Sequence, residues 1–237
     1  MRNFMNYRLG CAGLPAVIIA LVLNLPGVNF ANAASISVSP IRADVLEPST
    51  STSFTIKNDA ARSTNVQVRI FKWSLLNGAD HYAETDEVVA TPPVATLPHG
   101  SAATIRVVRV SRGPLKGEES YRLVVDEIPD ANRARNLGIN VALRYTIPVF
   151  FLSGATSQPR LTWTIQNEKG KRMLIANNAG GKHVRINSLK VGSATVVPGL
   201  AGYVLGHSSK KWELPSGASG TVSADSDAGR INASILH

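Results

Sequence analysis

Large apolar residues occupy every second position between Leu137 and Ile147, and small or polar residues fill the positions between them. Because side chains alternate between the two faces of a strand, this pattern predicts a β-strand with one apolar face. The apolar positions are Leu137, Ile139, Val141, Leu143, Tyr145 and Ile147. Such a strand is either half-buried in its own sheet or available to pair with a strand of another protein.

The same alternation recurs upstream, in short segments separated by turn residues. The expected strands lie at 36–45, 53–57, 65–73, 103–110 and 121–128. In the segment 65–73, we expect Val66, Val68, Ile70 and the ring of Trp73 to share one face. Short alternating segments at this spacing, without a convincing helical pattern, predict an all-β antiparallel sandwich.

The composition changes after Phe151. The segment 153–159 is small and polar, as expected of a linker, and a second strand-rich block follows it. The expected strands of this block are 160–165, 173–178, 184–189, 211–214 and 230–236. The pattern therefore predicts two sandwich domains, at about 34–152 and 153–237.

The first 33 residues are expected to be a cleaved signal peptide. Arg2 and Arg8 give a positive start, an uncharged apolar run covers 14–28, and Ala31-Asn32-Ala33 offers small residues for cleavage after Ala33. The alternative is a membrane anchor, but two prolines interrupt the run and it is short for a span. We therefore expect an exported chain whose mature part is not inserted in a membrane.

Cysteine content and charge narrow the function classes. Cys11 is the only cysteine and leaves with the signal peptide, so we expect neither a disulfide nor thiol chemistry in the mature chain. The formal net charge is +9, but the basic residues are scattered. Short clusters such as 169–172 and Lys210-Lys211 are expected in solvated turns. This distribution favours a basic surface over a nucleic-acid site.

Signatures of catalysis, metal binding and cofactor binding are missing from the sequence. The five histidines are isolated, and none has a metal-ligand spacing to a second histidine or a carboxylate. Ser219 lies in a glycine-rich turn and lacks the spacing of a nucleophile elbow. Asp126 and Glu127 are neighbours that point to opposite faces of a strand, so they cannot act as a carboxylate pair. The sequence therefore predicts a binding protein that needs no metal or cofactor.

Two arginines stand out in expected strands whose other residues are mostly small or apolar. Arg42 follows Ile41, and Arg144 lies on the polar side of the segment 137–147. Each is either a solvated surface arginine or part of an anion site. In the second interpretation, the two converge between the domains and hold a carboxylate, such as the end of another chain, by forked hydrogen bonds.

Taken together, these segments resemble the periplasmic pilus-assembly chaperones of the PapD-like superfamily. The residues that carry the resemblance are Ile41-Arg42 in the first strand, Thr91-Pro92-Pro93, a Glu-Ser pair before a strand that ends in Ile-Pro at 119–129, the strand 137–147, and Ile147-Pro148-Val149-Phe150-Phe151. This last segment resembles the archaic, Csu-like branch.

The resemblance implies two immunoglobulin-like β-sandwich domains at an angle, with a cleft between them, in the periplasm. It implies that the chain binds pilus or fimbrial subunits by donor-strand complementation and passes them to an outer-membrane usher. Leu137, Ile139, Val141 and Leu143 would be the donor-strand residues, and Arg42 and Arg144 would anchor the subunit's terminal carboxylate. No catalytic residue, metal or cofactor is implied.

The chain departs from the better-known members at two positions. Thr146 stands where those members carry a lysine two residues beyond Arg144, and Phe150-Phe151-Leu152 replaces an Arg-Pro pair at the end of the first domain. The second anchor and the means of bridging the two domains are therefore expected to differ.

Two other function classes remain open at this point. The chain could be a secreted adhesin or a surface structural subunit, or it could be a small exported hydrolase, for which no site is found. The sequence also leaves open whether the free protein covers its apolar strand by self-association.

Overall fold

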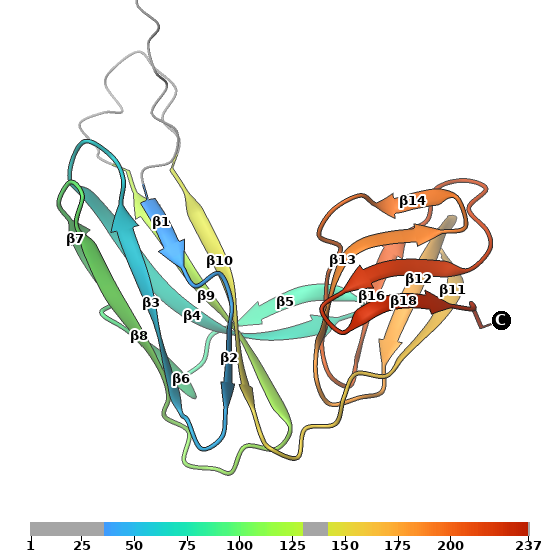
Figure 1. Cartoon of the computed structure of the whole chain (residues 1–237), viewed down its shortest axis with the longest axis horizontal. Helices are drawn as coiled ribbons and strands as arrows, with labels where there is room; N and C mark the ends of the chain where they lie inside the picture. The colour runs from blue at the N-terminus through green and yellow to red at the C-terminus, as the bar shows by residue number, and fades with distance from the viewer. Residues whose placement is uncertain (1–35, 130–141, 237) are drawn as a thin grey trace, which may run out of the picture. The chain divides into compact units, whose positions relative to one another are not determined.

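The structure, a computed structural model, describes residues 36–129 and 142–236. The signal peptide expected at 1–33 lies outside the described residues, as do the donor-strand positions Leu137, Ile139 and Val141. The described residues form eighteen strands joined by turns, and none of them belongs to an apolar helix of membrane-spanning length. The expected all-β architecture of two sandwiches is confirmed (Figure 1).

The first sandwich consists of two sheets built from residues before 153. The four-stranded sheet has the order β1 (Ile36–Ser39), β3 (Ser51–Asn58), β8 (Ala102–Arg109), β6 (Val88–Thr91). The other sheet has the order β2 (Ala43–Leu46), β10 (Arg144–Leu152), β9 (Glu118–Ile128), β4 (Thr64–Leu76), β5 (Ala79–Ala83), and β7 (Val94–Leu97) also pairs with β4. Apolar residues of both sheets, including Phe54, Val68 and Ile105, are buried between them.

Alternation explains which residues of β4 enter this core and corrects one expectation. Val66 and Val68 are buried in the core, and Ile70 packs against it. Trp73 is an odd number of residues from Ile70, so it points to the opposite face. There it packs with Phe150 instead, at a ring-centroid distance of 5.8 Å. The expectation that Trp73 shares the face of the valines is therefore wrong.

The first expected strand, 36–45, is divided between the two sheets. β1 pairs with β3 in the four-stranded sheet, and β2 pairs with β10 in the other. Pro40 lies at the crossing, where its missing N–H removes no ladder hydrogen bond. This crossing places Arg42 directly before β2, beside β10.

The second sandwich packs a three-stranded sheet against a five-stranded one. The first has the order β11 (Leu161–Glu168), β12 (Lys171–Asn178), β16 (Ser208–Glu213). The second has the order β14 (Ala194–Val197), β13 (Val184–Val191), β17 (Val222–Ser226), β18 (Gly229–Ala233), and β15 (Gly202–Val204) also pairs with β13. Trp163, Leu174 and Ile186 are among its fully buried residues.

The two sandwiches belong to one compact unit and share a small apolar cluster. Phe150 of β10 packs against Tyr203 of β15 in this cluster. The ring of His183 stacks on Phe150 with centroids 3.6 Å apart. Its Nδ1 lies 2.7 Å from Oε2 of Glu118, and both side chains are buried. His183, isolated in the sequence, therefore packs between the two sandwiches and has a hydrogen-bond partner in Glu118.

A second polar contact joins the sandwiches and corrects the expectation for Lys210. Lys210 lies in strand β16, not in a solvated turn, and is only 8% exposed. Its Nζ donates to Oδ2 of Asp80 on β5 over 2.9 Å. The same carboxylate accepts from Trp73 Nε1 through Oδ1, also over 2.9 Å. Lys210 is buried because it has this fixed counter-ion.

A partly buried acid–base network should make stability fall on acidification. Arg109 donates from Nε and Nη2 to the two oxygens of Glu119, each over 2.8 Å. The Tyr121 hydroxyl has one proton to donate and lies 2.8 Å from Glu87 and 3.0 Å from Glu119. Arg109 holds the pKa of Glu119 below its ordinary 4.5, and Lys72 does so for Glu87. Lowered pKa values stabilise the fold above pH 4.5, and this contribution is lost as the pH falls through the folded-state values.

Glu119→Gln tests this dependence. We expect the variant to unfold more readily than the parent at neutral pH, and the difference in unfolding free energy to shrink below pH 4.5. Urea unfolding at several pH values measures it. A difference that stays constant across the acid range would contradict the assignment.

Candidate strand-pairing site

β10 has an unpaired edge over the first part of its length. Its antiparallel partner β9 runs beside it from Arg144 to Leu152. Its parallel partner β2 covers the other edge only from Val149 to Leu152. Among the strands that the structure describes, none pairs with the β2 side of residues 144–148. This edge offers main-chain donors and acceptors to a further strand.

The hydrogen-bond pattern shows which groups point to this edge. The N–H of Glu127 donates to the carbonyl of Leu143 over 2.9 Å, so the odd-numbered residues of this segment face β9. Bonded and non-bonded pairs alternate in an antiparallel ladder. The N–H and C=O groups of Arg144 and Thr146 therefore point to the open edge. The carbonyl of Leu152 points the same way, where it accepts from Glu47.

Pro148 ends the open edge. It has the same parity as Thr146, so its nitrogen faces the β2 side but carries no hydrogen to donate. Ala43 lies opposite Val149, so Arg42 lies level with Pro148. At this point β10 offers no N–H to an added strand, and the added strand would meet the Arg42 side chain. The edge thus has a defined end with a cation at it.

Strand direction decides which end of an added chain would reach Arg42. β2 runs parallel to β10 and pairs with it from Val149 onward. A strand that pairs with residues 144–148 of β10 in the same parallel direction would end just before β2, at Arg42. The carboxyl end of a parallel partner would therefore point at this guanidinium. Charge-assisted, forked bonds between arginine and carboxylate are among the strongest polar contacts in proteins.

The guanidinium of Arg42 is already engaged by two carboxylates. Nε and Nη2 donate to Asp44 over 3.0 and 2.6 Å, and Nη1 donates to Oδ2 of Asp227 over 2.6 Å. Asp227 lies in the turn between β17 and β18 of the second sandwich. Its hydrogen-bonded acids, Asp44 first, raise the pKa of Arg42. The expected anchor is thus charged and holds a carboxylate of its own chain.

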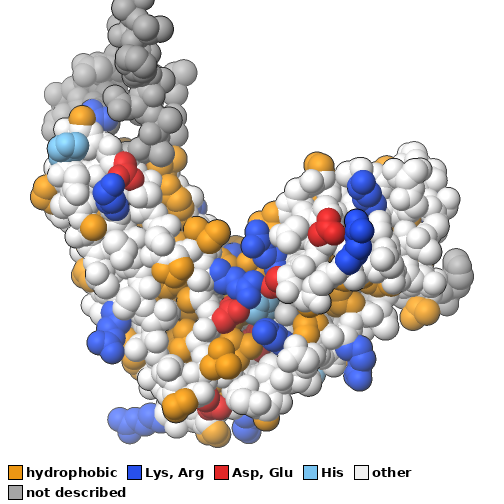
Figure 2. Space-filling model, in the orientation of Figure 1, with side chains coloured by type: hydrophobic (Ala, Val, Ile, Leu, Met, Phe, Trp, Pro, Cys, Tyr) orange, Lys and Arg blue, Asp and Glu red, His pale blue; other side chains and the backbone are white. Residues whose placement is uncertain are grey.

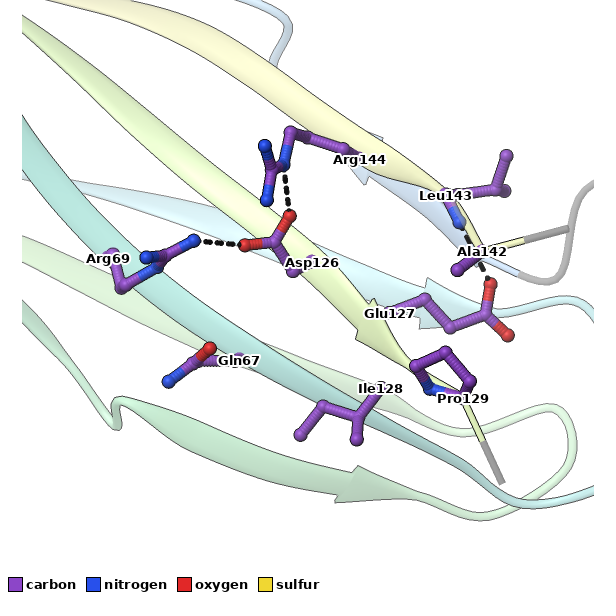
Figure 3. Close-up of a pocket in the computed structure, with 9 residues that line it drawn as sticks. All are labelled: Gln67, Arg69, Asp126, Glu127, Ile128, Pro129, Ala142, Leu143 and Arg144. Carbon is purple, nitrogen blue, oxygen red and sulfur yellow. Dashed lines mark hydrogen bonds and ion pairs between the residues drawn. The ribbon is translucent and has the colours of Figure 1, made fainter. Parts of the chain in front are cut away.

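Arg144 lies at the other end of the open edge. Its Nε donates to Asp126, which also accepts from Arg69 over 2.6 Å, and its side chain is 64% exposed (Figure 3). Arg144 and Pro148 are four residues apart, which corresponds to roughly 13 Å along a strand. The structure does not bring Arg42 and Arg144 together, so the expected convergence of this pair is wrong.

The described donor-strand position Leu143 packs partly against the core of its own sandwich, as does Tyr145. Tyr145 also donates from its hydroxyl to the carbonyl of Ile36 over 2.6 Å. Ile147 is fully inside this core. The apolar face therefore serves the protein's own fold from 143 to 147. The remaining positions of the pattern lie outside the described residues.

The surface of the sheet next to the start of β10, on the β9 side and away from the open edge, is hollowed and has both charged and apolar residues. A shallow groove is lined by residues of β4, β9 and the start of β10, including Gln67, Arg69, Asp126 and Leu143 (Figure 3). The face drawn in Figure 2 shows hydrophobic side chains next to basic and acidic ones. Ile41, beside Arg42, is 73% exposed.

Comparison with known proteins identifies the family. Residues 35–153, half of the chain, match the profile of the pili and flagellar-assembly chaperones, PapD N-terminal domain. The chain belongs to this chaperone family. It is a pilus-assembly chaperone, and the family is not enzymatic. A search of curated protein sequences gives no match.

Solved structures show the same two-sandwich fold. A complex of the chaperone CsuC with the tip adhesion subunit CsuE, from archaic chaperone-usher Csu pili of Acinetobacter baumannii, matches with a TM-score of 0.74 at 25% identity, over 86% of this chain and 100% of that one. The E. coli chaperone DraB matches with a TM-score of 0.61 at 21% identity, over 85% and 97% of the two chains. The SafB chaperone with the SafA pilin of Salmonella enterica matches with a TM-score of 0.65 at 17% identity, over 87% and 98%.

Proposed function

We propose that this chaperone captures a pilus subunit by lending it the strand 137–147. A subunit strand pairs parallel to the open edge of β10, and its terminal carboxylate binds Arg42. Leu137, Ile139 and Val141 fill the groove that the subunit's missing strand leaves open, and Leu143 contacts the end of this groove only with the part of its side chain that is not packed on the chaperone's own core. The unpaired edge over 144–148, with Arg42 at its end, is the observation that supports this proposal.

The proposal includes the cellular setting. Residues 1–33 direct export and are removed, and the mature chaperone acts in the periplasm. An outer-membrane usher then receives the complex, and the donor strand of a neighbouring subunit replaces that of the chaperone. Arg144 takes a lesser part, as a contact at the entry of the edge.

Co-expression with candidate pilus subunits tests the function. We expect one subunit to co-purify with the chaperone in a one-to-one complex and to resist proteolysis there. A subunit that stays soluble and protease-resistant without the chaperone would contradict the proposal. Display of the protein itself on the cell surface would support an adhesin instead.

Asp227 should compete with the subunit for Arg42. An incoming carboxylate that forks onto Nη1 and Nη2 of Arg42 needs the donor that Asp227 now holds. Asp227→Asn removes the acceptor facing Arg42, while its remaining oxygen can still accept from the N–H of Arg185. We expect the variant to bind the co-purifying subunit several-fold more tightly.

The affinity of the purified pair measures this effect. A subunit with a glycine extension at its C-terminus, which moves the carboxylate away from Arg42, serves as the control and should gain less. Weaker or unchanged binding of the native subunit by the Asp227→Asn chaperone would show that Asp227 does not compete.

A further inference from the structure

Arg122 lies on the same face and at the same level as Arg42. It is directly opposite Pro148 in the pairing of β9 with β10, and Arg42 is level with Pro148 on the other side. The neighbours Leu123 and Ala43 are buried in the core of the sandwich, so both arginines point to the outer face. Their Cα atoms are two strand spacings apart, about 10 Å.

Aromatic rings hold the Arg122 side chain. Its guanidinium carbon lies 3.6 Å from the ring centroid of Trp73 and 5.5 Å from that of Tyr203. Stacking of a guanidinium on an indole face is favourable and keeps the planar group oriented. The Nε atom is buried without a hydrogen-bond partner among the described residues.

Unlike Arg109 and Lys210, Arg122 has no acid of its own. Arg109 is paired with Glu119 and Lys210 with Asp80. Arg122 forms no ion pair within the described residues, since Asp80, the acid whose charge acts on it, is bound by Lys210. Burial accordingly lowers the pKa of Arg122, whereas the ion pair with Glu119 raises that of Arg109. A desolvated charge without a counter-ion is costly, and an arriving anion would relieve that cost.

We infer that Arg122 is the second cation that binds the subunit's terminal carboxylate, the role expected for Arg144. This inference rests on the proposed function. A carboxylate placed midway between the two arginines lies about one strand spacing from the Cα of each, within reach of both side chains. Pro148, which lies between the two arginines and is itself buried, adds no competing donor. When the carboxylate binds, the Arg122 guanidinium exchanges its stacking on Trp73 for two charge-assisted hydrogen bonds from its Nη atoms.

The pairing of Arg122 with a carboxylate also gives the site its specificity. Arg42 retains Asp44 in the complex, so it carries little net charge toward the ligand. Arg122 has no such acid and supplies the uncompensated positive charge. A chain that ends in a carboxylate at this register is therefore bound better than one that continues past it.

The test compares two forms of the co-purifying subunit, the native form and one with a glycine extension that displaces its carboxylate. We expect the parent chaperone to prefer the native form, and Arg122→Gln to reduce that preference about tenfold. Arg106→Gln, an exposed arginine on β8 in the other sheet of the first sandwich, is the matched control and should leave this preference unchanged. Arg122→Met keeps the packing on Trp73 without the charge, and should show the same loss if Arg122→Gln folds poorly.

The preference is a ratio, so a purely structural defect that weakens both complexes equally does not change it. If Arg122→Gln and Arg122→Met keep the full preference while Arg42→Gln removes it, Arg122 has no part in the site and the proposed function stands. If the parent chaperone has no preference at all, the carboxylate site itself is wrong.

Discussion

Replacing Val141 by glutamate is expected to abolish the complex with a pilus subunit. In the alternating segment 137–147, Val141 is central on the apolar face. Inserting an ionised carboxylate into an apolar groove without a partner costs several kcal/mol, so affinity should fall more than about 1,000-fold. Because Val141 lies outside the described residues, this expectation depends on the sequence pattern alone.

Asn140→Glu is the matched control for Val141→Glu. It adds the same charge one position away, on the polar face, and should retain the complex. Both variants should have the parent's unfolding free energy, measured by urea titration. If Val141→Glu still binds the subunit with parental affinity, Val141 is not a donor-strand residue.

Arg42→Gln is expected to lower the affinity for the subunit by about 30-fold or more. Removing one partner of a buried, hydrogen-bonded charge pair costs at least about 2 kcal/mol, and this loss appears mainly as faster dissociation. The free chaperone should lose less, because the pairs of Arg42 with Asp44 and Asp227 are partly exposed.

Titration of the purified pair and thermal unfolding of the free chaperone measure the two effects of Arg42→Gln. Arg144→Gln is the control, since its pair with Asp126 is exposed and lies at the far end of the edge. Equal losses of affinity in the two variants would show that Arg42 has no special place in capture.

The sequence predicts the strands that have one buried face and misses those that do not. β3 and β8 alternate between core and solvent over most of their length, and each lies near the position expected from the sequence. β5 is exposed along its whole length, so its sequence shows no alternation of apolar and polar residues that would predict a strand. β15 is three residues long, which is too short for a pattern. The division of 36–45 between two sheets depends on pairing partners that no local pattern reveals.

The site was predictable only in part. Arg42 stands out in the sequence as a lone cation in a mild strand. Its partner Asp227 is far along the chain, and only the contact of the two sandwiches brings them together. The roles of Pro148 and Arg122 follow only from the register of β9, β10 and β2, which places both residues beside Arg42. Arg144 is also a lone cation in an otherwise apolar and small-residue segment, but on β10 it lies four residues from Pro148, the residue level with Arg42.

A crystal structure of the chaperone with its co-purifying subunit is the most direct test of strand lending. We expect a subunit strand to run parallel to β10, to bond with the main-chain groups of Arg144 and Thr146, and to end with its carboxylate at Arg42. We also expect Ile139 and Val141 to lie inside the subunit. A complex in which the segment around Val141 is enclosed in the chaperone's own core, away from the subunit, would contradict the account.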